Sequence, residues 1–175
     1  MRSKRLTRSF YNRPTLTVAK QLLGKFLVKD GKIGQINEVE AYVSDIDPAC
    51  HAYNGMTKRT KVMFGSSGYS YVYFIYGMYF CFNVVTEKKG KGCAVLIRSV
   101  KPVSGFDSSD YLKTDGPGKL CKAFGITKKD NGIDLCSSKD FFIEDHGYKV
   151  GSIKRLKRIG INKGTELEWR FVCKL

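Results

Sequence analysis

The 175-residue chain lacks any apolar run of about eighteen residues, the length that a membrane-spanning helix needs, so no such helix is expected. Its basic N-terminus, residues 1–5, is followed by polar residues and not by an apolar segment, which excludes an ordinary secretory signal. With two histidines and no Cys-x-x-Cys pair, the sequence predicts no metal site. We therefore expect reduced, mostly buried thiols in a cytoplasmic protein, at Cys50, Cys81, Cys93, Cys121, Cys136 and Cys173.

Internal repeats and low-complexity linkers are also absent, and the chain is too short for two comfortable domains. We therefore expect one domain over residues 1–175. Hydrophobic residues make up 42% of the chain and aromatic residues 13%, which indicates a folded globular protein rather than a disordered one.

Acidic residues are scarce relative to basic ones: 16 Asp and Glu face 31 Lys and Arg, which leaves a formal net charge of +15. Such an excess indicates a polyanionic partner, most often nucleic acid or an anionic membrane. A charge that serves only solubility is the alternative.

The hydrophobic pattern predicts several strands and few helices. Apolar residues at helical spacing predict a helix from Thr15 that stops at Gly24, and a short helix follows Gly116 and ends at Gly125. Strands are predicted over residues 25–29, 32–43, 93–100 and 168–174. This order of elements predicts an α+β fold, with a curved antiparallel sheet, flanking helices and a protruding β-hairpin.

The predicted hairpin, residues 69–83, holds five of the ten tyrosines. Its pattern predicts two strands joined by a tight turn at Gly77 and Met78, with Tyr76 at the base of the turn. An aromatic side chain at a hairpin tip of a basic protein suits a wedge that enters a base stack. A hairpin buried in the core is the alternative, and the stretch alone leaves both open. Val72, Phe74 and Phe80 are expected in the core even if Tyr76 is a wedge.

Two segments suit contacts with phosphate. The long connection 44–68 carries Lys58, Arg59 and Lys61, and a loop of this length in a compact domain is often functional. Lys119 follows a Gly-Pro-Gly sequence that lacks the spacing of a P-loop, but a glycine-rich helix start can still bind phosphate through backbone N–H groups. Solvated loops are the alternative. A further basic cluster comprises Lys154, Arg155, Lys157 and Arg158.

The strand predicted over residues 32–43 carries the best candidate for chemistry. Alternation places Gly34, Ile36, Glu38, Glu40 and Tyr42 on one face, so two acids and a tyrosine lie together. A carboxylate buried beside aromatic rings can act as general base for a water molecule, and Arg98 is a natural counter-charge that would keep it ionised. A purely structural Glu–Arg pair is the alternative. Together with the basic surface, this set favours an enzyme that acts on a nucleobase extruded from its stack.

Several motifs, in the same order along the chain, resemble the alkyladenine (3-methyladenine) DNA glycosylase family. The similarity extends from Thr15 to Ile161, and it departs from the family pattern at Thr57-Lys58-Arg59, where Thr-Pro-Arg is usual. The motifs that carry the resemblance are residues 38–42, 47–53, 62–65, 71–83, 95–98 and 116–121.

This resemblance implies a monofunctional DNA glycosylase of base excision repair. Such an enzyme flips an alkylated or deaminated purine (3-methyladenine, 7-methylguanine, hypoxanthine or ethenoadenine) out of double-stranded DNA. It hydrolyses the bond from base to sugar and leaves an abasic site. No metal or organic cofactor is implied, and we expect a monomer that acts on DNA in a bacterial-type cytoplasm. A non-catalytic module that binds tRNA or DNA is the alternative.

By position, the resemblance also implies residue roles. Glu40 matches the general base that activates water, and Arg98, with the main chain at Ile159, matches the groups that hold this water. Asn83 matches the residue that disfavours the exocyclic amine of guanine at the pocket floor. The walls of the implied base pocket are Tyr42, His51 and Tyr73, and the implied DNA wedge is Tyr76, supported by Met78 and Tyr79.

Overall fold

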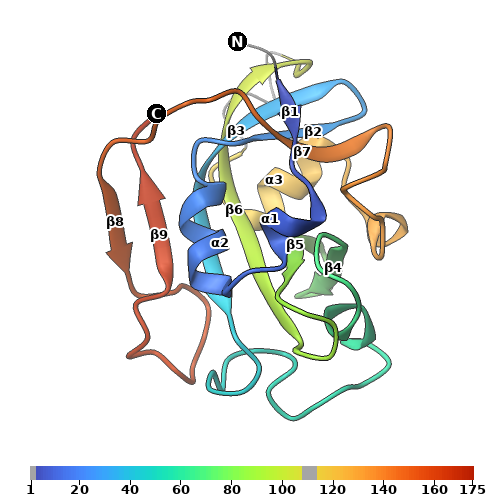
Figure 1. The fold of residues 1–175 in the computed structure, drawn as a ribbon, viewed down its shortest axis with the longest axis vertical. Helices are drawn as coiled ribbons and strands as arrows, with labels where there is room; N and C mark the ends of the chain where they lie inside the picture. Colours follow the sequence, from blue (N-terminus) through green and yellow to red (C-terminus); the bar gives the residue numbers. More distant parts are fainter. Residues whose placement is uncertain (1–2, 108–113) are drawn as a thin grey trace.

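One antiparallel sheet runs through the computed structural model, which describes residues 3–107 and 114–175 (Figure 1). Within these residues the strand order is β1-β7-β2-β3-β6-β5-β4, and β9, paired with β8, is added beside β3. The predicted α+β fold with an antiparallel sheet is confirmed. The strands are β1 (Lys4–Arg5), β2 (Phe26–Lys29), β3 (Lys32–Tyr42), β4 (Ser70–Ile75), β5 (Tyr79–Thr86), β6 (Cys93–Ser104), β7 (Phe141–Asp145), β8 (Ile153–Leu156) and β9 (Arg170–Cys173).

Helices α1 (Arg8–Tyr11), α2 (Thr15–Leu22) and α3 (Pro117–Phe124) accompany the sheet, with 3-10 turns η1 (Lys61–Phe64) and η2 (Lys128–Asp130). Proline at the first position of α3 and Gly125 in the left-handed region after it (φ 68°) start and stop that helix, because both conformations suit these residues at helix ends. None of the helices in the described residues is long and apolar enough to cross a membrane.

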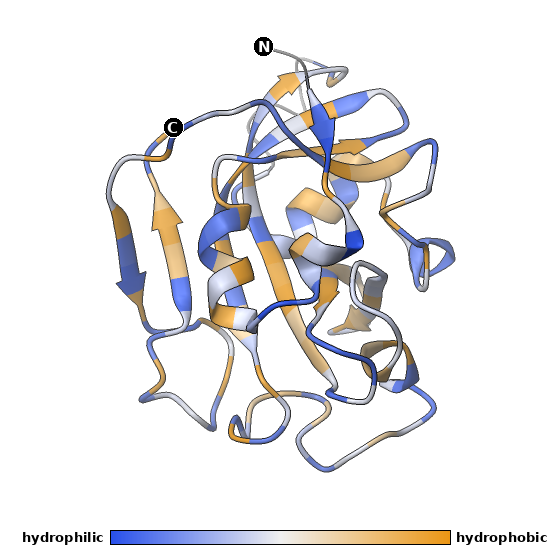
Figure 2. Cartoon of the chain, viewed as in Figure 1, coloured by the Kyte–Doolittle hydropathy of each residue, from blue (hydrophilic) through white to orange (hydrophobic). Residues whose placement is uncertain are grey.

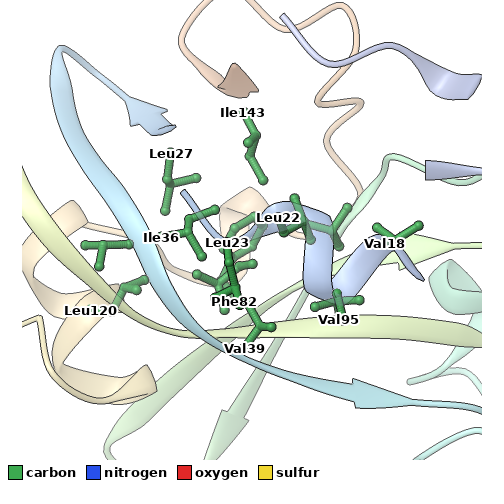
Figure 3. Close-up of a cluster of buried hydrophobic side chains, with 14 of the residues drawn as sticks. Val18, Leu22, Leu23, Leu27, Ile36, Val39, Phe82, Val95, Leu120 and Ile143 are labelled. Carbon is green, nitrogen blue, oxygen red and sulfur yellow. The ribbon is translucent and has the colours of Figure 1, made fainter. Parts of the chain in front are cut away.

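The main core forms where α2 and α3 pack with the inward side chains of β3, β5 and β6 (Figure 3). The long strand β6 is hydrophobic along much of its length, whereas the short edge strand β8 carries two basic residues at its centre (Figure 2). All six cysteines are free, and five are buried as expected. The core residues labelled in Figure 3 are Val18, Leu22, Leu23, Leu27, Ile36, Val39, Phe82, Val95, Leu120 and Ile143.

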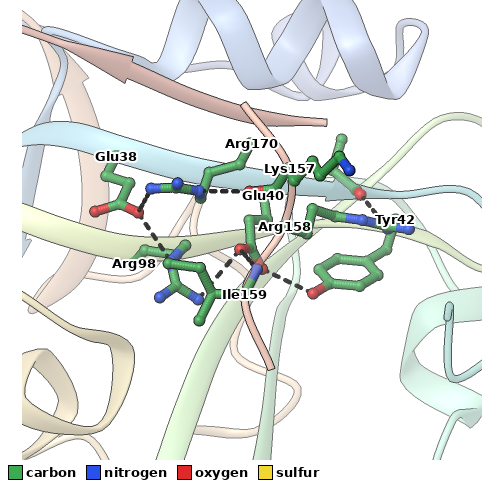
Figure 4. Close-up of polar contacts among 9 residues, drawn as sticks. Glu38, Glu40, Tyr42, Arg98, Lys157, Arg158, Ile159 and Arg170 are labelled. Carbon is green, nitrogen blue, oxygen red and sulfur yellow. Dashed lines mark hydrogen bonds and ion pairs between the residues drawn. The ribbon is translucent and has the colours of Figure 1, made fainter. Parts of the chain in front are cut away.

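Strand β3 organises the sheet because it pairs with β6 along almost its whole length, whereas its other edge pairs first with β2 and then, from Glu38 to Glu40, with β9. Its register with β6 shifts on either side of Glu38, which indicates a β-bulge at that point. Val39 and Ala41 belong to the core cluster, while Glu38, Glu40 and Tyr42 form the other face, as predicted. Ile36, expected on that face too, lies instead in the core, because the bulge before Glu38 shifts the alternation. The segment between β8 and β9 covers this second face (Figure 4), and Glu40 is consequently fully buried.

The β4–β5 hairpin has the predicted strands but a different turn. Tyr76 (φ 51°) and Gly77 (φ 67°) are its central residues, and the N–H of Met78 donates to the C=O of Ile75 at 3.2 Å. The expected centre at Gly77 and Met78 is therefore wrong by one residue. Two consecutive positive φ values are typical of a type I′ turn, whose twist matches that of the paired strands. For tyrosine this conformation costs about 1–2 kcal/mol.

Only part of the expected core at this hairpin is buried. Val72 is 5% exposed, but Phe74 is 51% exposed, and its ring packs on the half-buried Phe80 with centroids 4.9 Å apart. Phe74 as a core residue is therefore wrong, since alternation fixes the face of a side chain but not whether anything covers that face.

Candidate active site

Glu40 lies at the centre of a set of polar contacts that joins β3, β6 and the segment after β8 (Figure 4). Its Oε1 accepts the N–H of Ile159 at 2.8 Å, and its Oε2 accepts the hydroxyl of Tyr42 at 2.8 Å. The Nη1 of Arg98 lies 3.3 Å from Oε1. Burial raises the pKa of Glu40, while Arg98, the Ile159 amide and the Tyr42 hydroxyl oppose this shift by favouring the ionised carboxylate.

Arg98 is held on its other side by Glu38. The Nε of Arg98 donates to Oε1 of Glu38 at 3.0 Å, and the same oxygen accepts Nη1 of Arg170 at 3.0 Å. Arg170 also donates from Nε to the C=O of Lys157 at 2.7 Å, two residues before Ile159. Arg98 therefore bridges two carboxylates that alternate along β3, and its guanidinium orientation is fixed by both.

A cleft of about 590 Å³ opens beside this set, within the usual range for ligand sites. It extends to Tyr76 at the hairpin tip, and a smaller cavity continues from it toward Asn83. The structure therefore brings together all four residues predicted to form a base pocket. The cleft is lined by Tyr42, His51, Arg59, Tyr73, Phe74, Ile75, Tyr76, Cys81, Leu96, Arg98, Pro117, Ile159 and Gly160.

Aromatic contacts fix the pocket walls. The ring of His51 meets that of Tyr73 edge-on at 4.5 Å, and its Nδ1 lies 3.0 Å from the hydroxyl of Tyr71. Although much of His51 is exposed, burial of its ring against these tyrosines lowers its pKa to about 4, with a smaller contribution from Arg59. His51 is therefore neutral at pH 7 and offers an uncharged ring to a ligand. Tyr71 lines the inner cavity, although the sequence reasoning did not assign it to the pocket.

Asn83 is 3% exposed at the inner end of the pocket. Its position on β5 is directly opposite Tyr71 on β4, and its Nδ2 donates to the C=O of Tyr71 at 3.1 Å. This bond to the backbone fixes which way the amide faces, so its oxygen and nitrogen present a defined hydrogen-bonding pattern.

The residues predicted as a DNA wedge form the exposed end of the hairpin. Tyr76 is 81% exposed, Met78 64% and Tyr79 41%. The ring of Tyr79 lies so close to Gly118 that a Cβ there would stand 2.9 Å from it, so the hairpin packs on the start of α3. Tyr76 itself borders the cleft.

The four predicted phosphate contacts are exposed, at two places in the fold. The guanidinium of Arg59 lies 5.2 Å from the ring centroid of Tyr73, at the edge of the cleft. Lys58 and Lys61 occupy the same loop, and Lys119 at the start of α3 pairs with Asp115 at 2.9 Å. Their role toward phosphate stays a prediction.

Sequence reasoning missed a buried ion pair behind the pocket. In the sequence Arg158 belongs to a basic cluster whose other members are exposed. Its own side chain is fully buried and makes two hydrogen bonds to Asp47, at 2.5 and 2.7 Å. Its guanidinium also lies 4.6 Å from the ring centroid of Tyr42. A run of basic residues gives no sign that one of them has a partner 111 positions away.

No group of three or more His, Cys, Asp and Glu side chains in residues 3–107 and 114–175 is placed to hold a metal ion.

Comparison with known proteins gives a consistent assignment. The family described as Methylpurine-DNA glycosylase (MPG) matches residues 9–175. A protein of Wolbachia pipientis subsp. Culex pipiens, named "Putative 3-methyladenine DNA glycosylase", is 51% identical over 95% of this chain and 88% of its own length. Proteins with the same name from Alkaliphilus oremlandii and Rickettsia rickettsii are each 48% identical, covering 97% and 95% of this chain and 96% and 88% of their own lengths. The chain belongs to the methylpurine-DNA glycosylase family.

Proposed function

We propose that this protein is a monofunctional DNA glycosylase that flips a damaged purine from double-stranded DNA into the aromatic cleft and hydrolyses its bond to deoxyribose. The observation that carries the proposal is a fully buried carboxylate, Glu40, held beside the cleft by Arg98, Tyr42 and Ile159. A net charge of +15 suits a DNA partner. Membership of the methylpurine-DNA glycosylase family and the names of the relatives also support it.

The proposed chemistry is a hydrolytic displacement at the sugar. A water oxygen bonds to C1′ while the bond from C1′ to the purine nitrogen breaks, and the purine leaves with the bonding electrons. Glu40 accepts the proton of the water as general base. Its negative charge also stabilises the positive charge that develops on the sugar, in a site from which bulk water is largely excluded. No lysine nucleophile is involved, so the DNA strand is not cut.

The cleft suits purines with altered rings. Base–aromatic stacking contributes about 1–3 kcal/mol per base, and the tyrosine faces favour a cationic alkylpurine. Neutral His51 adds an aromatic contact without repelling such a cation. Damaged bases also cost less to unpair. We therefore propose 3-methyladenine, 7-methylguanine, hypoxanthine and ethenoadenine as substrates, with Asn83 at the pocket floor disfavouring the exocyclic amine of guanine.

The hairpin tip is proposed to fill the gap that the flipped nucleotide leaves. Tyr76 is almost fully exposed, borders the cleft and has a backbone conformation unfavourable for tyrosine. Strained, exposed aromatic residues persist where function requires them. Met78 in the same turn and Tyr79 at the start of β5 follow it.

Excision from duplexes that carry hypoxanthine or 1,N6-ethenoadenine tests this function. We expect cleavage at the lesion only after alkali treatment, and no covalent complex on borohydride addition. Equal binding of lesion DNA, undamaged DNA and RNA without base release would instead favour a non-catalytic binding module, and a borohydride-trapped complex would indicate a lysine nucleophile.

A further inference from the structure

The Arg158–Asp47 pair is more completely buried than its role in stability explains. Both side chains have no exposed surface, and the two hydrogen bonds between them form the fork-to-carboxylate arrangement typical of arginine. Removing two charges from water costs several kcal/mol per ion, and well-packed hydrophobic replacements of such pairs are often neutral or stabilising. Burial of this pair therefore points to something other than fold stability.

Arg158 joins the segments that carry the site. Its Nη1 donates to the C=O of Ala41, the residue between Glu40 and Tyr42, at 2.9 Å. Asp47 accepts the N–H of Ala49 at 3.0 Å and so shapes the turn that leads to His51. In Figure 1 the loop after β3 and the loop between β8 and β9 lie side by side, and this ion pair is a contact between them.

The loop between β8 and β9 also carries the main-chain amide that donates a hydrogen bond to Glu40, the proposed general base. Ile159, whose N–H donates to Glu40, directly follows Arg158 in the chain. Nη2 of Arg158 lies 3.3 Å from the C=O of Gly164, across the same loop. A Cβ at Gly164 would stand 3.0 Å from Oδ1 of Asp47 and 3.1 Å from Nη2 of Arg158, so the backbone passes too close for a side chain.

We propose that the Arg158–Asp47 pair is a positioning device for base excision, which fixes the Ile159 amide and the Tyr42 ring against Glu40 and sets the local charge at that carboxylate. This role rests on the proposed function. Neither residue contacts the flipped base; both act through Glu40, Tyr42 and Ile159.

The pair also bears on the titration of Glu40, because Arg158 favours its ionised form. Asp47 carries the opposite charge, so removing either partner leaves a buried charge of one sign near Glu40. The other groups that face Glu40 are Arg98 from β6, Tyr42 from β3, Tyr73 from β4 and Cys81 from β5, with Glu38 and Arg170 behind Arg98.

The first test removes both charges, by combining Arg158→Met with Asp47→Leu. We expect retained thermal stability and an affinity within about threefold for a duplex with a tetrahydrofuran abasic site. Single-turnover excision of hypoxanthine should fall by about 10- to 100-fold, since small misplacements of reacting groups cost this much. Excision at the wild-type rate would overturn the positioning role. A control away from the site is Lys29→Met at the end of β2, opposite the first residue of β3. It breaks ion pairs with Asp130 and Asp30 and should leave excision unchanged.

The second test uses the single variants and the pH dependence of single-turnover excision. Arg158→Met leaves a buried negative charge, so the acid limb should move to higher pH, whereas Asp47→Asn should move it to lower pH. If the pair were only structural, both variants would excise more slowly, but the acid limb of the pH–rate profile would keep its position. If these variants do not fold, Arg158→Lys is the test. Lysine keeps the positive charge but lacks the two parallel N–H donors of the guanidinium, so we expect about tenfold slower excision at unchanged affinity.

These outcomes are separable from failure of the proposed function. If the wild-type protein releases no base, or if Glu40→Gln remains active, the proposed function fails. If the wild-type protein is active, Glu40→Gln is inactive and the double variant is fully active, only the positioning role fails.

Discussion

The two ends of the cleft are built in opposite ways. At the inner end, Glu40 lies behind the lining residues Tyr42, Arg98 and Ile159 and is fully buried, and each of its oxygens accepts at least one hydrogen bond from them. At the outer end, Tyr76 is 81% exposed, and the turn imposes on it an unfavourable backbone conformation. Charge and burial define one end, whereas shape and exposure define the other.

This difference indicates two separate tasks. A general base needs a defined charge and position, which polar contacts from β3, β6 and the β8–β9 segment provide. A group that enters a base stack needs only to protrude and to be aromatic. Changes at the inner end should therefore act on the rate of bond cleavage, and changes at the tip on binding.

The largest expected effect is that of Glu40→Gln. The amide keeps the size of the side chain but cannot accept the proton of water, so single-turnover excision should fall by about 10²- to 10⁴-fold or more. Affinity for lesion DNA should remain, because the pocket walls and the tip are intact. Gel-shift and excision assays on one preparation measure both, and an active Glu40→Gln enzyme would remove Glu40 from the role of base.

Acid pH should imitate this substitution in the wild-type enzyme. Burial raises the pKa of Glu40, so protonation on acidification begins at a higher pH than for an ordinary glutamate, and the excision rate should fall about tenfold per pH unit below that pKa. His51, with a pKa of about 4, is neutral throughout the upper part of this range. A pH–rate profile checks this, and His51→Gln is the control. Its acid limb should keep its position, and a limb that disappears would assign the titration to the histidine.

Much of this arrangement follows from the sequence. Strand alternation in residues 32–43 predicts the shared face of Glu38, Glu40 and Tyr42, and the aromatic stretch predicts the hairpin. These are local patterns, with a period of two residues. The pocket, by contrast, was assigned by resemblance, because its walls come from β3, β4, β5 and the loop after β3.

What local patterns cannot predict depends on distant partners or on strain. Arg158 is buried because Asp47 lies opposite, and nothing in the basic run 154–158 distinguishes it from its exposed neighbours. The turn is centred on Tyr76 and Gly77, although tyrosine disfavours positive φ. A prediction that gives positive φ to glycine and not to tyrosine therefore places the turn one residue too late. Phe74 faces outward on β4, where its ring packs on Phe80 but stays 51% exposed.

A smaller expected effect separates the turn from the wedge. Tyr76→Asn creates Asn-Gly, the sequence most favourable for a type I′ turn, and removes the aromatic ring. We expect the free energy of unfolding to rise by about 1 kcal/mol, because asparagine tolerates positive φ. Lesion affinity should fall about tenfold, in line with one lost stacking contact. Thermal unfolding and binding titrations measure the two, and Met78→Ala, which shortens a tip side chain without changing the two central turn residues, is the control. Unchanged affinity would contradict the wedge assignment.

The smallest expected effect concerns charge far from the chemistry. Lys119 is exposed at the start of α3, next to the hairpin, and forms an ion pair with the exposed Asp115. If it contacts a phosphate, Lys119→Gln should weaken binding about equally for lesion and undamaged DNA and reduce the slope of log K against log salt by about 1. Lys128→Gln, a change to an exposed lysine of η2, is the charge-matched control and should leave the slope in place. Excision of bound lesions should be unchanged, because Glu40 and its partners do not contact this residue. A selective loss for lesion DNA would place Lys119 in base recognition and would blur the division between the two ends of the cleft.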